Sequence, residues 1–105
     1  MIIRGYKHKS IRFEWDENKE KINIQKHGID FVTASHVFLD DNRLEYYDEL
    51  HSTADEERYI TIGYAGGVLT VVYTERADAL RIISARIATG KEKEIYYGNE
   101  GIHIK

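Results

Sequence analysis

The segment Arg81-Ile82-Ile83-Ser84-Ala85-Arg86 places two guanidinium groups in a run that otherwise has the composition of a buried strand. Strict alternation along a strand predicts that Arg86 shares a face with Ile82. Arg81 is then expected on the opposite face, together with Ala85. An arginine cannot lose its charge, so a partly buried one needs an anionic partner. That partner is either an internal carboxylate or the phosphate of a ligand.

Other side chains that could bind a phosphate or move a proton lie elsewhere in the chain. Arg58 and Arg76 flank segments rich in β-branched and aromatic residues. Arginine can bind a phosphate through two parallel hydrogen bonds, whereas lysine offers a point charge. Lys26 and His27 end a predicted helix, and a histidine side chain titrates near neutral pH. The tyrosines that could stack on an unpaired base are Tyr59, Tyr73, Tyr96 and Tyr97.

Each candidate also has a purely structural explanation. His27 would be a favourable cation at a helix C-terminus, where a positive charge stabilises by about 0.3–1 kcal/mol. Arg86 could pair with Glu92 or Asp16, and Arg58 with the acidic residues that precede it. Lysines on helices are commonly solvated, and tyrosines on strands commonly pack in the core or at an edge. The sequence leaves both explanations open.

Composition restricts the class of protein. With 105 residues, 42% hydrophobic and 31% charged, the chain is expected to form one globular domain. It has no cysteine, and His8, His36, His51 and His103 lack the spacing of metal ligands, so we expect neither a metal nor a cofactor. No signal peptide or membrane-spanning run is evident, which favours a cytoplasmic protein without a membrane partner.

The net charge of −3 is unevenly distributed along the chain. Residues 1–27 carry a net +3, residues 28–57 a net −8 and residues 58–105 a net +2. If the basic flanks meet in space, they form a surface that attracts phosphates. The acidic segment would suit a basic protein partner, or it is a solvated loop. The isoelectric point near 5.9 argues against a nucleic-acid binder that acts alone.

The chain is predicted to contain a strand and two helices, then a meander of strands, then a last helix. In order, the predicted elements are a strand over 11–15, helices over 17–26 and 31–39, strands over 44–47, 58–62, 68–74 and up to 86, and a helix from 90 to about 97. The boundary signals are Asp16 and Asp30 as N-caps, Gly28 after the first helix, Ala65-Gly66-Gly67 as a hairpin turn, and Thr89 with Glu92 as a capping box. This order is typical of the α+β class.

The remaining segments are predicted to be irregular. Residues 75–78 are expected to form a turn, and Gly98 is expected to stop the last helix. Residues 1–9 and 99–105 are predicted to be frayed.

Two groups of motifs occur in order along the chain. The first comprises residues 13–19, Asn23 and residues 26–31, and the second comprises residues 57–63, 82–86, Ala88-Thr89 and Glu92. Together they resemble the BrnT-type toxins of bacterial toxin–antitoxin pairs. The resemblance covers residues 11–97, which predicts an N-terminal extension over 1–10, a toxin domain over 11–97 and a C-terminal tail over 98–105. Gly90 departs from the family, where a basic residue is commoner, which removes one positive charge at the start of the last helix.

The resemblance implies a RelE-like fold, with a curved antiparallel sheet, two N-terminal helices and one C-terminal helix. It also implies a ribonuclease that inhibits translation and is neutralised by a BrnA-like antitoxin. The expected partners are therefore this antitoxin, an RNA substrate, and operator DNA only through the antitoxin. The alternative is a non-catalytic protein-binding module that represses its own operon together with the antitoxin.

Metal-independent RNA cleavage needs a base for the 2′-hydroxyl, cations for the charge on phosphorus and an acid for the leaving 5′ oxygen. It leaves a 2′,3′-cyclic phosphate. The predicted catalytic residues are Lys26, His27, Arg58 and Arg86, and the predicted substrate-binding residues are Arg76, Arg81, Tyr59, Tyr73 and Tyr97. This hypothesis requires the arginines to converge on one concave surface and to lack internal acidic partners.

Overall fold

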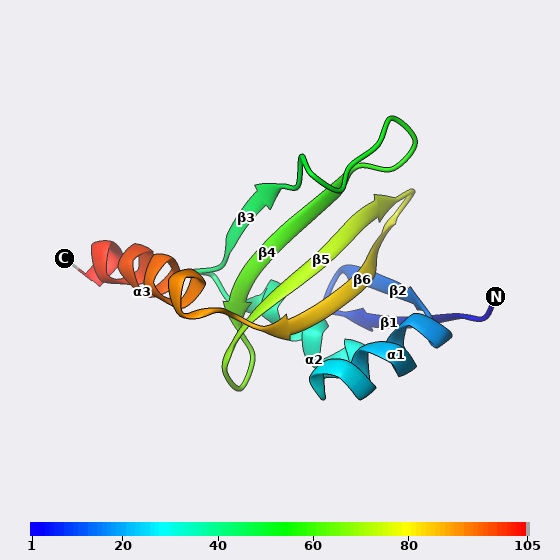
Figure 1. Cartoon of the computed structure of the whole chain (residues 1–105), viewed down its shortest axis with the longest axis horizontal. Coiled ribbons are helices and arrows are strands. Elements are labelled where there is room, and N and C mark those ends of the chain that lie inside the picture. Colours follow the sequence, from blue (N-terminus) through cyan, green and yellow to red (C-terminus); the bar gives the residue numbers. More distant parts are fainter. Residues whose placement is uncertain (105) are drawn as a thin grey trace.

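A single six-stranded sheet, in the order β1-β2-β6-β5-β4-β3, is the framework of the protein (Figure 1). The structure is a computed structural model that describes the backbone of residues 1–104 and the side chains of residues 1–98. The strands are β1 (Ile3–His8), β2 (Ile11–Asp16), β3 (Leu44–Tyr47), β4 (Arg58–Tyr64), β5 (Val68–Arg76) and β6 (Ala79–Ile87). Neighbouring strands are antiparallel except β2 and β6, which pair in parallel.

The helices occupy the predicted places, which confirms the α+β class. They are α1 (Glu17–His27), α2 (Phe31–Ser35), a 3-10 helix η1 (His36–Leu39) and α3 (Gly90–Ile104). The predicted local signals hold: Asp16 and Asp30 cap α1 and α2, and Gly28 is left-handed with a φ of 70°. Within the described part of the chain, no helix is both long and apolar enough to cross a membrane.

The two faces of the sheet are covered differently. The inner face packs on α2 and η1, and its core holds Phe31 and Phe38 against Val71, Ile82 and Ala85. The opposite face, here called the outer face, is covered at one end only, where Tyr96 of α3 packs with a small apolar cluster. Figure 1 shows α3 projecting from that end, away from α1 and α2. The outer face is therefore the one on which side chains can meet a ligand.

A β-bulge in β6 changes the predicted orientation of its side chains. Val72 pairs with Ser84 but Tyr73 pairs with Ile82, so Ile83 is an extra residue in the strand. Ile82 and Ala85 consequently both point into the core, contrary to the prediction from strict alternation. The bulge shifts the alternation by one residue and so places both arginines of the strand on the outer face.

The N-terminal residues form an edge strand, so the prediction that residues 1–9 are frayed is wrong. β1 pairs with β2 over its whole length, and the amide of Glu17 donates to the Ile2 carbonyl at 2.9 Å. Arg4 also forms an ion pair with Glu17. Backbone pairing holds this strand, so it needs no apolar alternation that a sequence pattern would reveal.

Two other predicted boundaries are also wrong. β5 continues to Arg76, and the turn to β6 is confined to Ala77 and Asp78. The backbone of α3 continues through Gly98, because glycine in a helix costs only about 1 kcal/mol relative to alanine. The predicted fraying of residues 99–105 therefore does not apply to the backbone of residues 99–104, whereas residue 105 lies outside the described residues.

Candidate active site

Three arginines gather at one end of the outer face. Arg58 of β4 lies opposite Thr74 of β5, which lies opposite Arg81 of β6. Residues directly opposite each other in a sheet point to the same face, so Arg58 and Arg81 project together. Arg76 is two residues beyond Thr74 on β5 and shares that face. The sheet register thus assembles Arg58, Arg76 and Arg81 from distant parts of the sequence.

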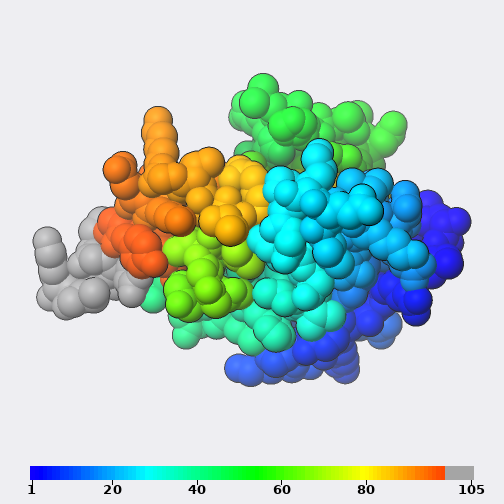
Figure 2. Space-filling model, turned by 60° about the horizontal axis from the view of Figure 1, so that its bottom comes forward, coloured from blue at the N-terminus to red at the C-terminus, as the bar shows by residue number. Residues whose placement is uncertain are grey.

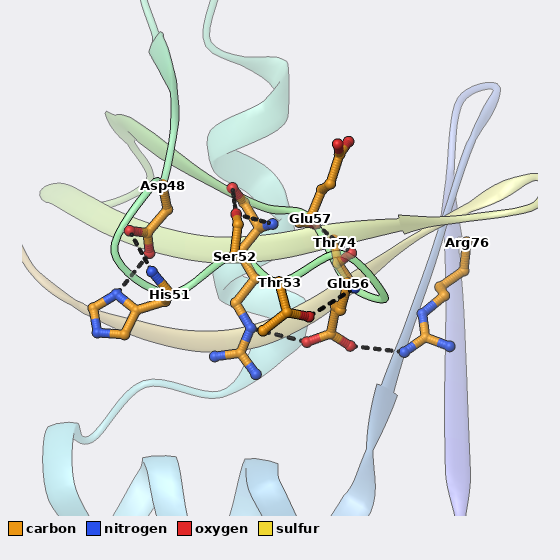
Figure 3. Close-up of polar contacts among 9 residues, drawn as sticks. Asp48, His51, Ser52, Thr53, Glu56, Glu57, Thr74 and Arg76 are labelled. Carbon is orange, nitrogen blue, oxygen red and sulfur yellow. Dashed lines mark hydrogen bonds and ion pairs between the residues drawn. The ribbon is translucent and has the colours of Figure 1, made fainter.

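Glu56 connects two of these arginines. One carboxylate oxygen, Oε1, lies 2.9 Å from Nε of Arg58, and Oε2 lies 2.8 Å from Nη2 of Arg76 (Figure 3). The hydrogen bond from Arg58 lowers the pKa of Glu56 below its usual value, with a further contribution from Arg76. Glu56 is therefore an ionised hydrogen-bond acceptor at neutral pH.

The third arginine of the group, Arg81, pairs with Glu14 across the parallel contact between β2 and β6. Its Nε and Nη2 lie 2.7 Å and 2.5 Å from one oxygen, Oε2 of Glu14. Both side chains are about three-quarters covered, with 23% and 24% of their surface exposed. This pair explains how a guanidinium is tolerated on an interior strand.

Arg86 lies at the other end of β6 and is bound differently. Both of its terminal nitrogens contact Glu92, at 2.7 Å and 3.0 Å. Glu92 also accepts from the Thr89 amide and the Thr70 hydroxyl, and the bond from Arg86 contributes most to lowering its pKa to about 2. The structural alternative for Arg86, a pair with Glu92, is therefore present in the structure.

The expectation that the arginines lack internal acidic partners is wrong. Each of the four has a carboxylate partner, supplied by Glu14, Glu56 or Glu92. All four arginines lie on the outer face, but Arg86 lies five residues from Arg81 and so about 15 Å away along the strand, so the four do not converge on one patch. The physical reason for the pairing is that a half-buried guanidinium must be neutralised before any ligand arrives.

The arginines differ in the nitrogens left for a ligand. Among the contacts of the described residues, Arg58 uses only Nε, so both terminal nitrogens remain available. Arg76 uses one terminal nitrogen, whereas Arg86 uses both. Bidentate binding of a phosphate needs two neighbouring N–H groups. Arg58 meets this requirement end-on, through both terminal nitrogens, whereas Arg86 meets it only side-on, through Nε and the second N–H of Nη2.

A pocket of about 190 Å³ lies between the start of α1 and the ends of β5 and β6. Its lining includes Glu56, Arg76 and Arg81, together with Lys19 of α1. Figure 2 shows α1 (light blue) beside β6 (orange), with the loop before β4 (green) above both. Three basic side chains and two acidic ones, Asp16 and Glu56, line this pocket, so its lining carries a small excess of positive charge.

The structure does not bring Lys26 and His27 to this group. Lys19 lies at the pocket beside Arg81, and Asn23 contacts Ala85 farther along β6, so α1 runs alongside the strand. His27 follows Lys19 by eight residues, about 12 Å along the helix axis. Both residues are exposed and belong to the Arg86 end of β6.

The predicted stacking tyrosines have different surroundings. Tyr73 is only 6% exposed and its hydroxyl donates to Glu45 at 2.9 Å, so its ring cannot stack on a base. Burial raises the pKa of Tyr73 well above its usual value. Tyr59 packs against Tyr73 on the inner face, with ring centroids 5.6 Å apart. Tyr97 is half exposed, and Tyr96 is buried against the sheet.

Sequence analysis missed a histidine–carboxylate pair in the loop between β3 and β4. The ring nitrogen Nδ1 of His51 lies 2.9 Å from Oδ2 of Asp48. The sequence signal for such a pair is the spacing of three residues between an aspartate and a histidine in a predicted loop. Among the described residues, no group of three or more histidine and carboxylate side chains is placed to hold a metal ion.

Two comparisons with known proteins find similar chains. The family model described as "Ribonuclease toxin, BrnT, of type II toxin-antitoxin system" matches residues 15–92. The chain is also similar to the crystal structure of the Brucella abortus ribonuclease toxin BrnT, with 32% identity and a TM-score of 0.54 over 71% of this chain and 92% of that one. No curated protein matches. This chain belongs to the BrnT ribonuclease toxins of type II toxin–antitoxin systems.

Proposed function

We propose that this toxin cleaves RNA without a metal ion, leaves a 2′,3′-cyclic phosphate, and is neutralised by a BrnA-like antitoxin. The observation that supports the proposal most directly is the group of Arg58, Arg76 and Arg81 at one end of the outer face. Such cations stabilise the charge that develops on the phosphorus oxygens when the 2′ oxygen attacks.

Arg58 is the proposed phosphate ligand. Glu56 binds Nε of Arg58 and thereby orients the guanidinium, which leaves the two terminal nitrogens for the scissile phosphate. Arg76 is held by the same carboxylate, and Arg81 adds a further positive charge beside the pocket. Arg86, Lys26 and His27 lie toward the other end of β6, where they can contact the RNA strand on one side of the cleaved bond.

The experiment uses toxin that has been separated from its antitoxin and refolded. It is incubated with end-labelled single-stranded RNA in EDTA, and the product ends are analysed. We expect cleavage that EDTA does not inhibit, and 3′ ends that resist periodate because they carry a cyclic phosphate. RNA that is cut only after magnesium is added, or that carries free 3′-hydroxyl ends, would contradict the proposal.

An acidic surface next to the site favours a second function, in which the toxin and its antitoxin together repress their operon. A pocket beside Arg76 is lined by Asp55, Glu57 and Glu75, which suit a basic arm of a partner protein. This function would coexist with cleavage. A gel shift on promoter DNA with antitoxin, in the presence and absence of an inactive toxin variant, tests it. We expect tighter binding with both proteins.

A further inference from the structure

His51 and Asp48 form a pair whose geometry is typical of an oriented imidazole. The Asp48 side chain is 7% exposed, whereas the His51 side chain is 67% exposed. Oδ2 of Asp48 binds Nδ1 of the ring, and Oδ1 accepts the backbone amide of His51 at 3.3 Å. A carboxylate at one ring nitrogen fixes the direction of the ring and leaves the other nitrogen, Nε2, facing solvent.

The loop that carries this pair is attached to Arg58. The amide of Asp48 donates to the Arg58 carbonyl at 2.9 Å. The hydroxyl of Ser52 accepts from the Arg58 amide at 2.8 Å and donates to the Arg58 carbonyl at 3.2 Å. These bonds fix the loop that carries His51 relative to Arg58, the residue proposed to bind the phosphate.

Glu56 lies in the same loop, where its amide donates to the Thr53 hydroxyl. Figure 3 shows the His51 ring, the Glu56 carboxylate and the Arg76 guanidinium on the same side of the loop. The imidazole and the carboxylate of the loop thus face the same region as the guanidinium of Arg76 at the end of β5.

We propose that His51, oriented by Asp48, is the general acid of RNA cleavage, with Glu56 as the general base. This inference rests on the proposed function. The 2′ oxygen forms a bond to phosphorus as its proton passes to Glu56, and the bond from phosphorus to the 5′ oxygen breaks as that oxygen takes the proton from Nε2 of His51. Because Glu56 is held ionised by Arg58, it can accept a proton but has none to donate, which leaves donation to His51.

The test compares two RNA substrates that differ in one atom. In the second substrate, sulfur replaces the 5′ oxygen at the cleavage site, and a thiolate leaves without being protonated. We expect His51→Ala to slow cleavage of the ordinary RNA about 100-fold or more, and to cleave the sulfur substrate nearly as fast as wild type. Asp48→Asn, which turns an amide toward Nδ1, should show the same pattern with a smaller loss.

Two variants serve as controls. Glu56→Gln lacks the base, so it should remain slow on both substrates. His8→Ala removes a half-buried histidine of β1, outside the loop, and should cleave both substrates like wild type. Thermal unfolding of each variant reports whether the loop change has disturbed the fold.

Two results would overturn the inference. One is cleavage of ordinary RNA by His51→Ala at the wild-type rate, and the other is an equal loss on both substrates. Wild-type toxin that fails to cut ordinary RNA in EDTA would overturn the proposed function as well, so the two failures are distinguishable.

Discussion

At the scale of residues, the paired arginines of the outer face differ in which N–H groups their salt bridges leave free. Arg58 and Arg86 are both paired and both partly exposed, with 30% and 40% of their side-chain surface accessible. Glu56 binds Arg58 through Nε, whereas Glu92 takes both terminal nitrogens of Arg86. The first arrangement leaves both terminal nitrogens of Arg58 for a ligand, whereas the second leaves Arg86 only Nε and one N–H of Nη2.

Replacing Arg58 by alanine should therefore affect activity more than stability. We expect Arg58→Ala to reduce RNA cleavage at least about 100-fold, because one bidentate cation at the phosphate is lost. The free energy of unfolding should fall by about 1 kcal/mol or less, because the lost ion pair is partly solvated. Single-turnover cleavage and urea unfolding measure the two effects.

Arg43 provides a matched control for this variant. Its side chain is also 30% exposed, and it also pairs with a glutamate, Glu45. Arg43 directly precedes β3, which places it beside the opposite end of β4 from Arg58. Arg43→Ala should cleave RNA like wild type. Equal losses for Arg43→Ala and Arg58→Ala would show that general surface charge, and not a phosphate site at Arg58, determines activity.

At the scale of elements, α1 is attached to the sheet by an amide side chain instead of an apolar face. Ile22 and Ile24 remain 48% and 43% exposed, whereas Asn23 is 4% exposed. The Asn23 side chain donates to the carbonyls of Ile29 and Ala85 and accepts from the Ala85 amide, at 2.9–3.0 Å. Asn23 thus makes the hydrogen bonds that a neighbouring strand would make, at the part of β6 that does not pair with β2.

Removing this amide should be strongly destabilising. We expect Asn23→Ala to lower the free energy of unfolding by about 2–4 kcal/mol, because it leaves a buried N–H and two buried carbonyls without partners. Urea unfolding followed by circular dichroism is the measurement. Gln25→Ala, an exposed site on the same helix, should change stability by less than about 0.5 kcal/mol. Similar values for both variants would refute the role of Asn23.

The attachment of α3 should depend on pH through Glu92. Arg86 holds the pKa of Glu92 at about 2, below the usual 4.5. The contribution of ionised Glu92 to the free energy of unfolding is therefore complete above pH 4.5 and is lost as the pH falls toward 2. We expect Glu92→Gln to be less stable than wild type by about 1–2 kcal/mol at pH 7, after allowance for solvent screening. The difference between the two proteins, measured by urea unfolding, should shrink between pH 4.5 and pH 2. A difference independent of pH would exclude this mechanism.

Elements whose signals are local could be predicted from the sequence, and those that depend on a distant partner could not. The caps at Asp16, Asp30 and Thr89 act within one turn, so the helix starts were recognised. The bulge at Ile83 exists only in relation to β5, and β1 only in relation to β2. Their positions are determined by pairing that no short pattern encodes.

The same distinction applies to the candidate site. Two local signals mark its arginines: Arg81 and Arg86 interrupt an apolar run, and Arg58 begins a predicted strand. The partners of Arg58 and Arg81, Glu56 and Glu14, and the position of Arg58 opposite Thr74, follow from the three-dimensional register. The distance of His27 from Arg81 depends likewise on how α1 lies along β6.

At the scale of the whole molecule, the protein combines a net negative charge with a local group of cations. The chain has a net charge of −3. Arg58, Arg76 and Arg81 outnumber their ion-pair partners Glu56 and Glu14, but Asp55, Glu57 and Glu75 line the adjacent pocket. Repulsion by the net charge acts at long range and is screened at physiological salt within about 8 Å. Contacts between phosphates and the three arginines are therefore expected to dominate RNA binding.

This balance can be measured with an RNA that cannot be cleaved, such as a 2′-O-methyl oligonucleotide. If three phosphates are neutralised, the logarithm of the affinity should fall with the logarithm of the salt concentration with a slope of about −2, or about 20-fold between 50 and 200 mM. Arg76→Ala removes one contact and should reduce the slope by about 0.7, whereas Arg43→Ala should leave it unchanged. An affinity that does not change with salt, or that rises as the repulsion by the net charge is screened, would show that the outer face does not bind the RNA backbone.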